Sequence, residues 1–412
     1  MTHSRRTFMS RLGQGLFGLG LVAGGAGLAG LVGRAGQALA AGGAKRRFLF
    51  VVNQGGWDPL CALAPMFDNA RVVMPVGATR ATLGGIPFVD HAQRPAVRAF
   101  FAAHAARSVI VHGLSVRSVS HDICQVTMMT GAPTGGAPDF ATRLAVAGTD
   151  AALPHFVVSG PTYPGALASL VARGGRTGQL QELITGSLAE RGDVAVTSAS
   201  RPAARAIEDF VARRTAAFAA AAPGPRREAL VTALGRAARL EDLQWDMSFA
   251  SDGSFTSQLE IAVEALERGI AQCVTVSPPV SWDTHTNSDN QQSPLWEALF
   301  AGLGQVMDRL RDVVVVVVSE MGRTPQLNAD QGRDHWPWTS ALVVGDGLTG
   351  GRVVGGYDAG YAGRGIDPRT AEIDDQRAAP TPAVLGATLL ALAGLDPGVL
   401  GPGATPLEGL LA

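Results

Sequence analysis

Lysine is almost absent from this 412-residue sequence: Lys45 is the only one, and arginine supplies the other positive charges. The chain also lacks an excess of either charge, with 34 Lys and Arg against 35 Asp and Glu and a formal net charge of −1. Proteins that bind nucleic acids or anionic membranes usually carry clustered positive charge. The composition therefore argues against a nucleic acid as partner.

Cysteine is scarce as well. Cys61, Cys124 and Cys273 are far apart and odd in number, and no Cys-x-x-Cys pair occurs. This pattern excludes a disulfide framework and a cysteine-rich metal site. A single bridge in an oxidising compartment stays open as an alternative, but buried free thiols are the favoured interpretation.

The amino terminus has the pattern of an export signal. Ser4-Arg-Arg-Thr-Phe8 is a twin-arginine sequence, and Ala38-Leu39-Ala40 is a small-residue cleavage site. Residues 12–32 between them are long enough to span a bilayer, so a retained anchor is the alternative, but eight glycines lower their helix propensity. We predict a cleaved signal peptide at residues 1–40, export by the twin-arginine translocase, a periplasmic or secreted location and no stable membrane anchor.

The mature chain, residues 41–412, alternates strand-like and helix-like segments, which predicts an α/β domain with a mostly parallel sheet and right-handed crossovers. Two or three helices at about residues 203–249 are expected to form a helical insertion or cap. The expected strands are 47–53, 108–112, 156–159, 272–276, 313–318 and 341–344, and the expected helices are 96–106, 294–310 and 381–394.

Polar residues cluster directly after a run of six valines, Val313 to Val318. Such a run is typical of a strand buried on both faces, inside a parallel sheet. Glu320 and Arg323 follow at its carboxyl end, and the Asp-His pair that ends in His335 comes soon after. Open α/β sheets bind ligands at this edge, so the cluster indicates a site for a cation or an anion.

Three more polar clusters follow predicted strands. Asp58 ends a Gln-Gly-Gly-Trp-Asp turn, where an aspartate that caps the turn is the common alternative. His121 lies in Ser118-Val-Ser-His-Asp122 and is either a ligand or a helix-start residue. Asp283 and His285 form an Asp-x-His pair on one side of an extended segment, and such a pair can bind a metal or be incidental.

Taken in order, these motifs resemble the domain of unknown function 1501 family. The resemblance also includes the twin-arginine leader and the segment Ala341-Leu-Val-Val-Gly-Asp-Gly-Leu-Thr-Gly-Gly-Arg352, and it extends from about residue 47 to 395. It implies an exported protein with the alkaline phosphatase and sulfatase type of three-layer α/β/α fold.

The resemblance also implies site residues. Asp58, Asp283, His285, Glu320 and His335 would hold a divalent cation, with zinc, manganese and magnesium all compatible. The cation would polarise an ester oxygen, and Arg323 would clamp the non-bridging oxygens. His121 should border the site, and Ser120 lies where a nucleophile is expected, with Ser118 and Thr127 as alternatives.

The chain departs from active phosphatases and sulfatases in three respects. Met321 stands where phosphatases usually carry a histidine after the metal carboxylate, no known nucleophile motif is present, and no sulfatase sequence surrounds Cys124. Two functions therefore stay open: a metal-dependent hydrolase acting on phosphate or sulfate esters, and a non-catalytic exported binding protein with a degenerate metal site. For the second, a protein of the domain of unknown function 1800 family is the expected partner.

Overall fold

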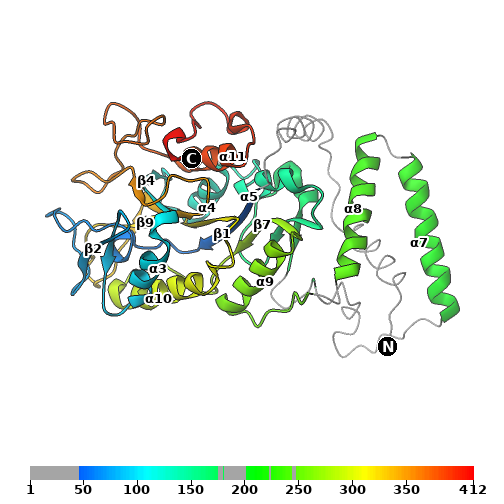
Figure 1. Ribbon diagram of the computed structural model, residues 1–412, viewed down its shortest axis with the longest axis horizontal. Coiled ribbons are helices and arrows are strands. Elements are labelled where there is room, and N and C mark those ends of the chain that lie inside the picture. Colours follow the sequence, from blue (N-terminus) through cyan, green and yellow to red (C-terminus); the bar gives the residue numbers. More distant parts are fainter. Residues whose placement is uncertain (1–45, 175–179, 181–200, 222–223, 244–246) are drawn as a thin grey trace.

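The computed structural model describes residues 46–174, 180, 201–221, 224–243 and 247–412. A twisted sheet of eight strands crosses the centre of the molecule (Figure 1), in the order β12-β4-β11-β8-β1-β7-β5-β6. Its strands are β1 (Arg47–Asn53), β4 (Ser108–Ser115), β5 (Leu153–Val157), β6 (Val171–Arg173), β7 (Ala271–Val276), β8 (Val313–Ser319), β11 (Trp338–Val344) and β12 (Arg352–Val354).

The sheet is parallel apart from β11, which is antiparallel to both neighbours, β4 and β8. The α/β class and the mostly parallel sheet are thus confirmed, and the antiparallel strand β11 contains the segment 341–344, which was expected as a strand. After β8 the chain forms β9 (Gly322–Arg323) and β10 (His335–Trp336), which pair with each other, and then returns as β11. Without a crossover helix, the returning strand can only run the opposite way.

Helices cover both faces of the sheet (Figure 1). Successive strand residues alternate between two cores: Leu49 and Val315 pack on one face with α3, α9 and α10, whereas Phe48 and Val316 pack on the other with α4, α5 and α11. This gives three layers. The helices are α3 (Pro95–His104), α4 (His121–Thr130), α5 (Phe140–Leu144), α9 (Phe255–Glu267), α10 (Ser288–Val306) and α11 (Pro382–Leu392).

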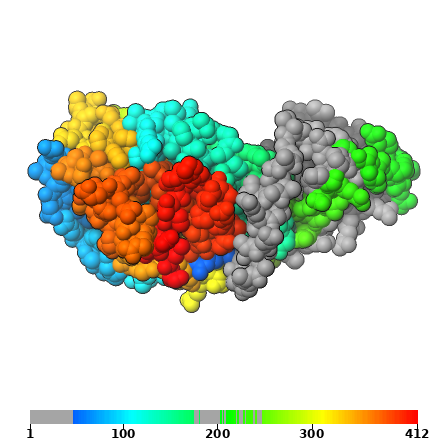
Figure 2. Space-filling model, turned by 90° about the horizontal axis from the view of Figure 1, so that it is seen from above, coloured from blue at the N-terminus to red at the C-terminus, as the bar shows by residue number. Residues whose placement is uncertain are grey.

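Two further helices, α7 (Arg201–Ala221) and α8 (Gly224–Leu243), lie at one end of the molecule (Figures 1 and 2). They fall in the region where an insertion was predicted. Arg236 of α8 donates to the carbonyls of Ser169 and Thr149, and Leu240 packs against the core, so α8 attaches the pair to the sheet.

The predicted signal peptide, residues 1–40, lies outside the described residues. In the part of the chain that is described, no helix combines the length and the apolar character needed to cross a bilayer. The three cysteines are buried and carry free thiols, as the sequence favoured.

A buried histidine of β4 should make the fold sensitive to acid. His112 is almost inaccessible, its Nδ1 lies 2.8 Å from Ser340 Oγ, and burial lowers its pKa to about 4. The unfolded chain, with a histidine pKa of about 6.5, then binds a proton that the native state does not. Between these two pH values, the free energy of unfolding should fall by about 1.4 kcal/mol per pH unit for this group as pH drops.

Urea unfolding of wild type and His112→Asn between pH 7 and pH 4.5, with chelator present in both, measures this effect. The variant is less stable at pH 7. Its free energy of unfolding should nevertheless depend less steeply on pH, by the equivalent of one bound proton. Equal slopes in the two proteins would contradict the assignment, since His104 and His155, whose pKa values burial also lowers, are unchanged in both.

Candidate metal centre

Four predicted site residues converge at the carboxyl edge of β8, β1 and β7. His121 is the first residue of α4, Asp283 and His285 lie in the loop between β7 and α10, and His335 opens β10. They come from three distant parts of the chain and meet because each part leaves or approaches the same edge of the sheet.

Their donor atoms are close together. Asp283 Oδ1 lies 3.2 Å from His335 Nε2 and 3.0 Å from His285 Nε2, and Asp283 Oδ2 lies 3.5 Å from His121 Nε2. The Nε2 atoms of His285 and His335 are only 3.0 Å apart. For bonds of about 2.0–2.1 Å, neighbouring ligands of a tetrahedral zinc ion lie roughly 3.3 Å apart. The ligand atoms of His121, Asp283 and His335 all lie within 4.8 Å of one another, so these three side chains could hold one metal ion, and His285 Nε2 lies 3.0 Å from Asp283 Oδ1 and from His335 Nε2.

The other nitrogen of each imidazole faces an acceptor. His121 Nδ1 lies 3.0 Å from Glu320 Oε1, and His285 Nδ1 lies 2.9 Å from Asp334 Oδ1. His335 Nδ1 lies 2.7 Å from the carbonyl oxygen of Val119. Because carboxylates and carbonyls only accept, each Nδ1 must carry the proton, and in the neutral ring each Nε2 then presents a lone pair.

Lone pairs that face one another repel unless a cation lies between them. When both rings are neutral, His285 Nε2 and His335 Nε2 are in this position, beside the Asp283 carboxylate, and His121 Nε2 is buried without a hydrogen-bond partner in the described structure. Histidines that bind metals almost always donate their second N–H to a carboxylate or carbonyl, as these three do. The three histidines thus already have the outer hydrogen bonds that a metal site would need.

The charge of the cluster also favours a cation. Burial acts to raise the pKa of Asp283, but Arg323, His335 and His285 outweigh it and lower the pKa to about 2. Asp283 is therefore ionised at any ordinary pH. A hydrogen bond to Glu320, opposed by burial, raises the pKa of His121. The carboxylates of Asp283, Glu320 and Asp334 lie in or beside the cluster, and the guanidinium of Arg323 contacts Asp283. When the imidazoles are neutral, this leaves an excess of negative charge.

Two glycines allow the loops to approach this closely. Gly55 has φ of +111°, and a Cβ there would lie 2.6 Å from the backbone nitrogens of Trp282 and Asp283. At Gly332, a Cβ would lie within 1.8 Å of the carbonyl oxygen of His285. Any side chain at either position would push the Asp283–His285 loop out of place.

Two predicted ligands lie elsewhere. Glu320 is buried and contacts His121, Gly55 N at 2.6 Å and Ser319, so it touches the cluster through His121. Asp58 is fully buried, its Oδ2 is 2.9 Å from Arg333 Nε, and its Oδ1 accepts from Leu60 N as a turn cap. Burial raises the pKa of Asp58, opposed by Arg333.

Arg323, the predicted oxyanion clamp, faces the protein itself. Its guanidinium is fully buried and donates to the carbonyls of Gly55, Gly56 and Arg333 and, at 2.6 Å, to Asp283 Oδ1. Arg323 thus ties the turn after β1 to the loop that carries Asp283. In the structure, Arg323 therefore holds Asp283 in position.

The candidate nucleophiles differ in accessibility. Ser120 is exposed at the amino-terminal cap of α4, next to His121. Ser118 Oγ accepts from Ser120 N, and buried Thr127 donates back to the carbonyl of Ile123. Of these three residues, Ser120 is the most exposed.

Sequence reasoning missed the residues that orient the ligands. Asp334 was seen only as the neighbour of His335, yet it binds His285, and Asn328 donates to the same oxygen at 3.2 Å. Trp57 and Trp282 lie inside the Gly-Gly-Trp-Asp and Ser-Trp-Asp motifs and are fully buried beneath the turns. The tryptophan in each of these two motifs is the sequence signal that could have indicated a buried support beneath the site.

Comparison with known proteins gives a family. A family model described as "Protein of unknown function (DUF1501)" matches residues 64–400. The chain belongs to this family. The match includes all four clustered side chains. No curated protein matches the chain.

The solved structure of the PH0037 protein from Pyrococcus horikoshii is similar to this chain, at 13% identity and a TM-score of 0.31. That likeness covers 74% of this chain and 87% of the other.

Proposed function

We propose that this protein is an exported, metal-dependent hydrolase of phosphate or sulfate esters, with one divalent cation bound by His121, Asp283, His285 and His335. The single observation that carries the metal site is the orientation of the imidazoles: each Nδ1 faces an acceptor, and each Nε2 lies within 3.5 Å of a carboxylate oxygen of Asp283. A bound cation would engage all four side chains at once, whereas the contact between His335 Nε2 and Asp283 Oδ1, at 3.2 Å, engages only two of them.

The donor set favours zinc or manganese over magnesium. Magnesium prefers oxygen ligands and keeps much of its water, whereas three imidazoles and one carboxylate suit a borderline transition metal. The half-exposed side chains of His285 and Asp283, with 43% and 35% of their surface accessible, leave one side of the site open to a substrate.

Such a cation, when bound, would act as a Lewis acid on an ester oxygen. The protein's own residues would do the rest. Asp283 and the three histidines would fix the position of the reacting centre, and Ser120 beside His121 is the candidate nucleophile. Arg323 would hold Asp283 in place rather than contact substrate, since all its bonds go to the protein.

The alternative is a non-catalytic exported protein whose metal has a structural role and whose function is to bind a partner, with a protein of the domain of unknown function 1800 family as the candidate. The observation in its favour is the number of donors. Four protein ligands close a tetrahedral site, whereas catalytic zinc sites usually keep one position for water or substrate. The two functions differ in coordination number and in turnover.

Metal loading and turnover should go together in the mature protein. We expect one equivalent of metal by elemental analysis, and hydrolysis of phosphate monoesters, diesters or sulfate esters that exhaustive chelation abolishes and zinc or manganese restores. Ser120→Ala should keep the metal and lose at least a hundredfold in kcat, since nucleophile removal leaves only binding and positioning. Stoichiometric metal without turnover of any ester would favour the binding protein, and activity that survives chelation would exclude this site.

Export should depend on the paired arginines. Replacing Arg5 and Arg6 with lysine should trap folded protein in the cytoplasm, because the twin-arginine sequence is read as an address. Fractionation of expressing cells, with detection of the mature protein cut near Ala40, measures this. Unchanged export of the double variant would show another route, and a mature protein that starts well before Ala40 would indicate a retained anchor.

A further inference from the structure

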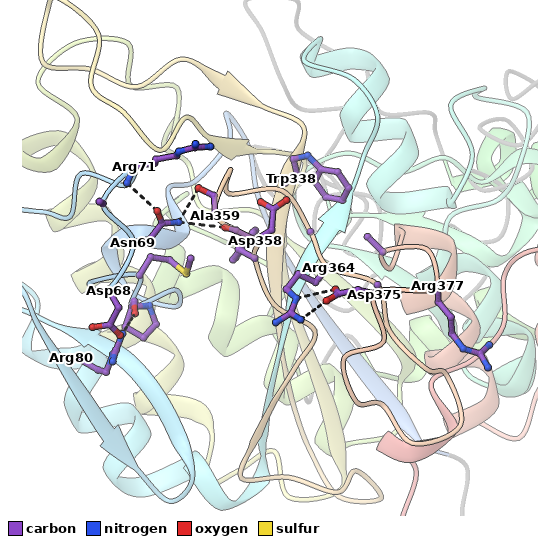
Figure 3. Close-up of a pocket in the computed structure, with 17 residues that line it drawn as sticks. Asp68, Asn69, Arg71, Arg80, Trp338, Asp358, Ala359, Arg364, Asp375 and Arg377 are labelled. Atoms are coloured by element: carbon purple, nitrogen blue, oxygen red, sulfur yellow. Dashed lines mark hydrogen bonds and ion pairs between the residues drawn. The ribbon is translucent and has the colours of Figure 1, made fainter.

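A second cleft, of about 1070 Å³, lies between the loop of residues 65–80 and the loop of residues 357–379 (Figure 3). It is separate from the four metal-site side chains, none of which lines it. Its volume is at the upper end of the range for small-molecule sites, which gives room for a ligand of several linked units. The function proposed above does not use this cleft.

The walls of the cleft are tied together. Asn69 Nδ2 donates across it to the carbonyl oxygens of Asp358 and Ala359, at 3.4 and 3.3 Å. Asp358 Oδ1 accepts from Gly360 N and Ala362 N, which orders the loop it belongs to. A cleft whose walls are already joined loses little conformational freedom when a ligand binds.

Charged side chains line the cleft as pairs. Figure 3 shows the Arg80–Asp68 pair on one side and the Arg364–Asp375 pair on the other, with closest N–O distances of 2.6 Å in each. In all, four arginines and three aspartates contribute to the lining, so the charge is nearly balanced. A balanced lining does not favour a polyanion, and its polarity does not favour an apolar ligand.

Trp338 adds an aromatic surface. Its indole is half-buried in the lining and rests against Gly363, where a Cβ would lie 2.7 Å from the ring. Paired guanidinium and carboxylate groups keep unused donors and lone pairs, which can bridge neighbouring hydroxyl groups of one ligand. A sugar ring matches this combination, because it offers an apolar C–H face to an indole and hydroxyls around its edge.

We propose that this cleft binds a neutral oligosaccharide. The cleft is also adjacent to the strand that carries His335: Trp336 and Trp338 both pack against the cluster that contains Tyr357 and Tyr361, and Trp336 Nε1 donates to the carbonyl of Tyr361. His335 precedes Trp336 in β10, and successive strand residues point to opposite faces. A glycan held here would therefore lie on the other side of the ribbon that carries a metal ligand.

Titration of the metal-free mature protein with neutral hexasaccharides of glucose, mannose or N-acetylglucosamine tests the proposal without any hydrolase assay. At least one should saturate a change in tryptophan fluorescence and show saturation-transfer NMR contacts. Trp338→Ala should weaken binding at least tenfold. Arg364→Gln should weaken it severalfold with the fold intact, whereas Arg98→Gln, which breaks a similar exposed pair with Asp90, should leave it unchanged.

Several results would overturn the proposal. One is no binding of any neutral hexasaccharide at millimolar concentration. Another is binding that Trp338→Ala and Arg364→Gln both leave unchanged, which would place the ligand elsewhere. Preference for a uronic acid hexamer or for a mixed-charge hexapeptide would assign the cleft to an anionic glycan or a peptide. Since no metal is present in this experiment, its failure leaves the proposed hydrolase untouched.

Discussion

His335→Ala should bind zinc at least a hundredfold more weakly than the wild-type protein does. The substitution removes a donor that lies 3.2 Å from Asp283 Oδ1 and 3.0 Å from His285 Nε2, near the centre of the cluster. Loss of an outer hydrogen bond to a metal-bound histidine already costs about 10–100-fold in affinity, so loss of the imidazole itself should cost more. Competition with a chromophoric chelator at pH 7.5 measures the Kd.

Two further variants sharpen that result. Asp334→Asn keeps all four side chains of the cluster but replaces the carboxylate that accepts from His285 Nδ1 with an uncharged amide. It should therefore weaken zinc binding by about 10–100-fold. His91→Ala is the control, because its ring contacts Val76 and Gln93 instead of the cluster. Zinc affinity that is equal in wild type and His335→Ala would show that the cation, if any, binds elsewhere.

The parts of the fold that the sequence predicted best are those with an unambiguous local pattern. The uninterrupted apolar runs after Arg47 and Asp312 became β1 and β8, with the expected bounds to within one residue. The helix expected from Pro294 instead begins at Ser288, six residues earlier. Proline is a common first residue of a helix, and the polar turn before it has no apolar spacing to mark it as helical.

The convergence of the site was predictable for a topological reason, whereas its chemistry was not. Polar residues after parallel strands meet at one edge whatever their side-chain directions, so Asp283, His285 and His335 came together as expected. Which carboxylate joins the histidine cluster depends on partners far away in the chain. Asp58 is neutralised by Arg333, and Glu320 is taken up by His121 and Gly55. Neither partner follows from local sequence.

Arg323→Ala should destabilise the protein by at least about 1–3 kcal/mol, the cost of leaving a buried hydrogen-bonding group without its partner. The guanidinium is fully buried, and its loss removes the Arg323 donors from Asp283 and from the carbonyls of Gly55, Gly56 and Arg333. Arg98→Ala removes an exposed bidentate contact to Asp90 and should cost far less stability, because solvent screens such a pair. Urea unfolding of the three metal-free proteins gives the comparison.

The same variant distinguishes a positioning role from the clamp that the family resemblance implied. If Arg323 positions Asp283, then Arg323→Ala should lose zinc affinity together with stability, and Arg323→Lys, which keeps a charge but not the fork, should lie between the two proteins in both measurements. A clamp on substrate oxygens predicts a different pattern: near-normal stability and zinc affinity, with a selective loss of kcat. That second pattern would show that the guanidinium turns outward when substrate binds, because in the present arrangement its hydrogen bonds all go to protein acceptors around Asp283.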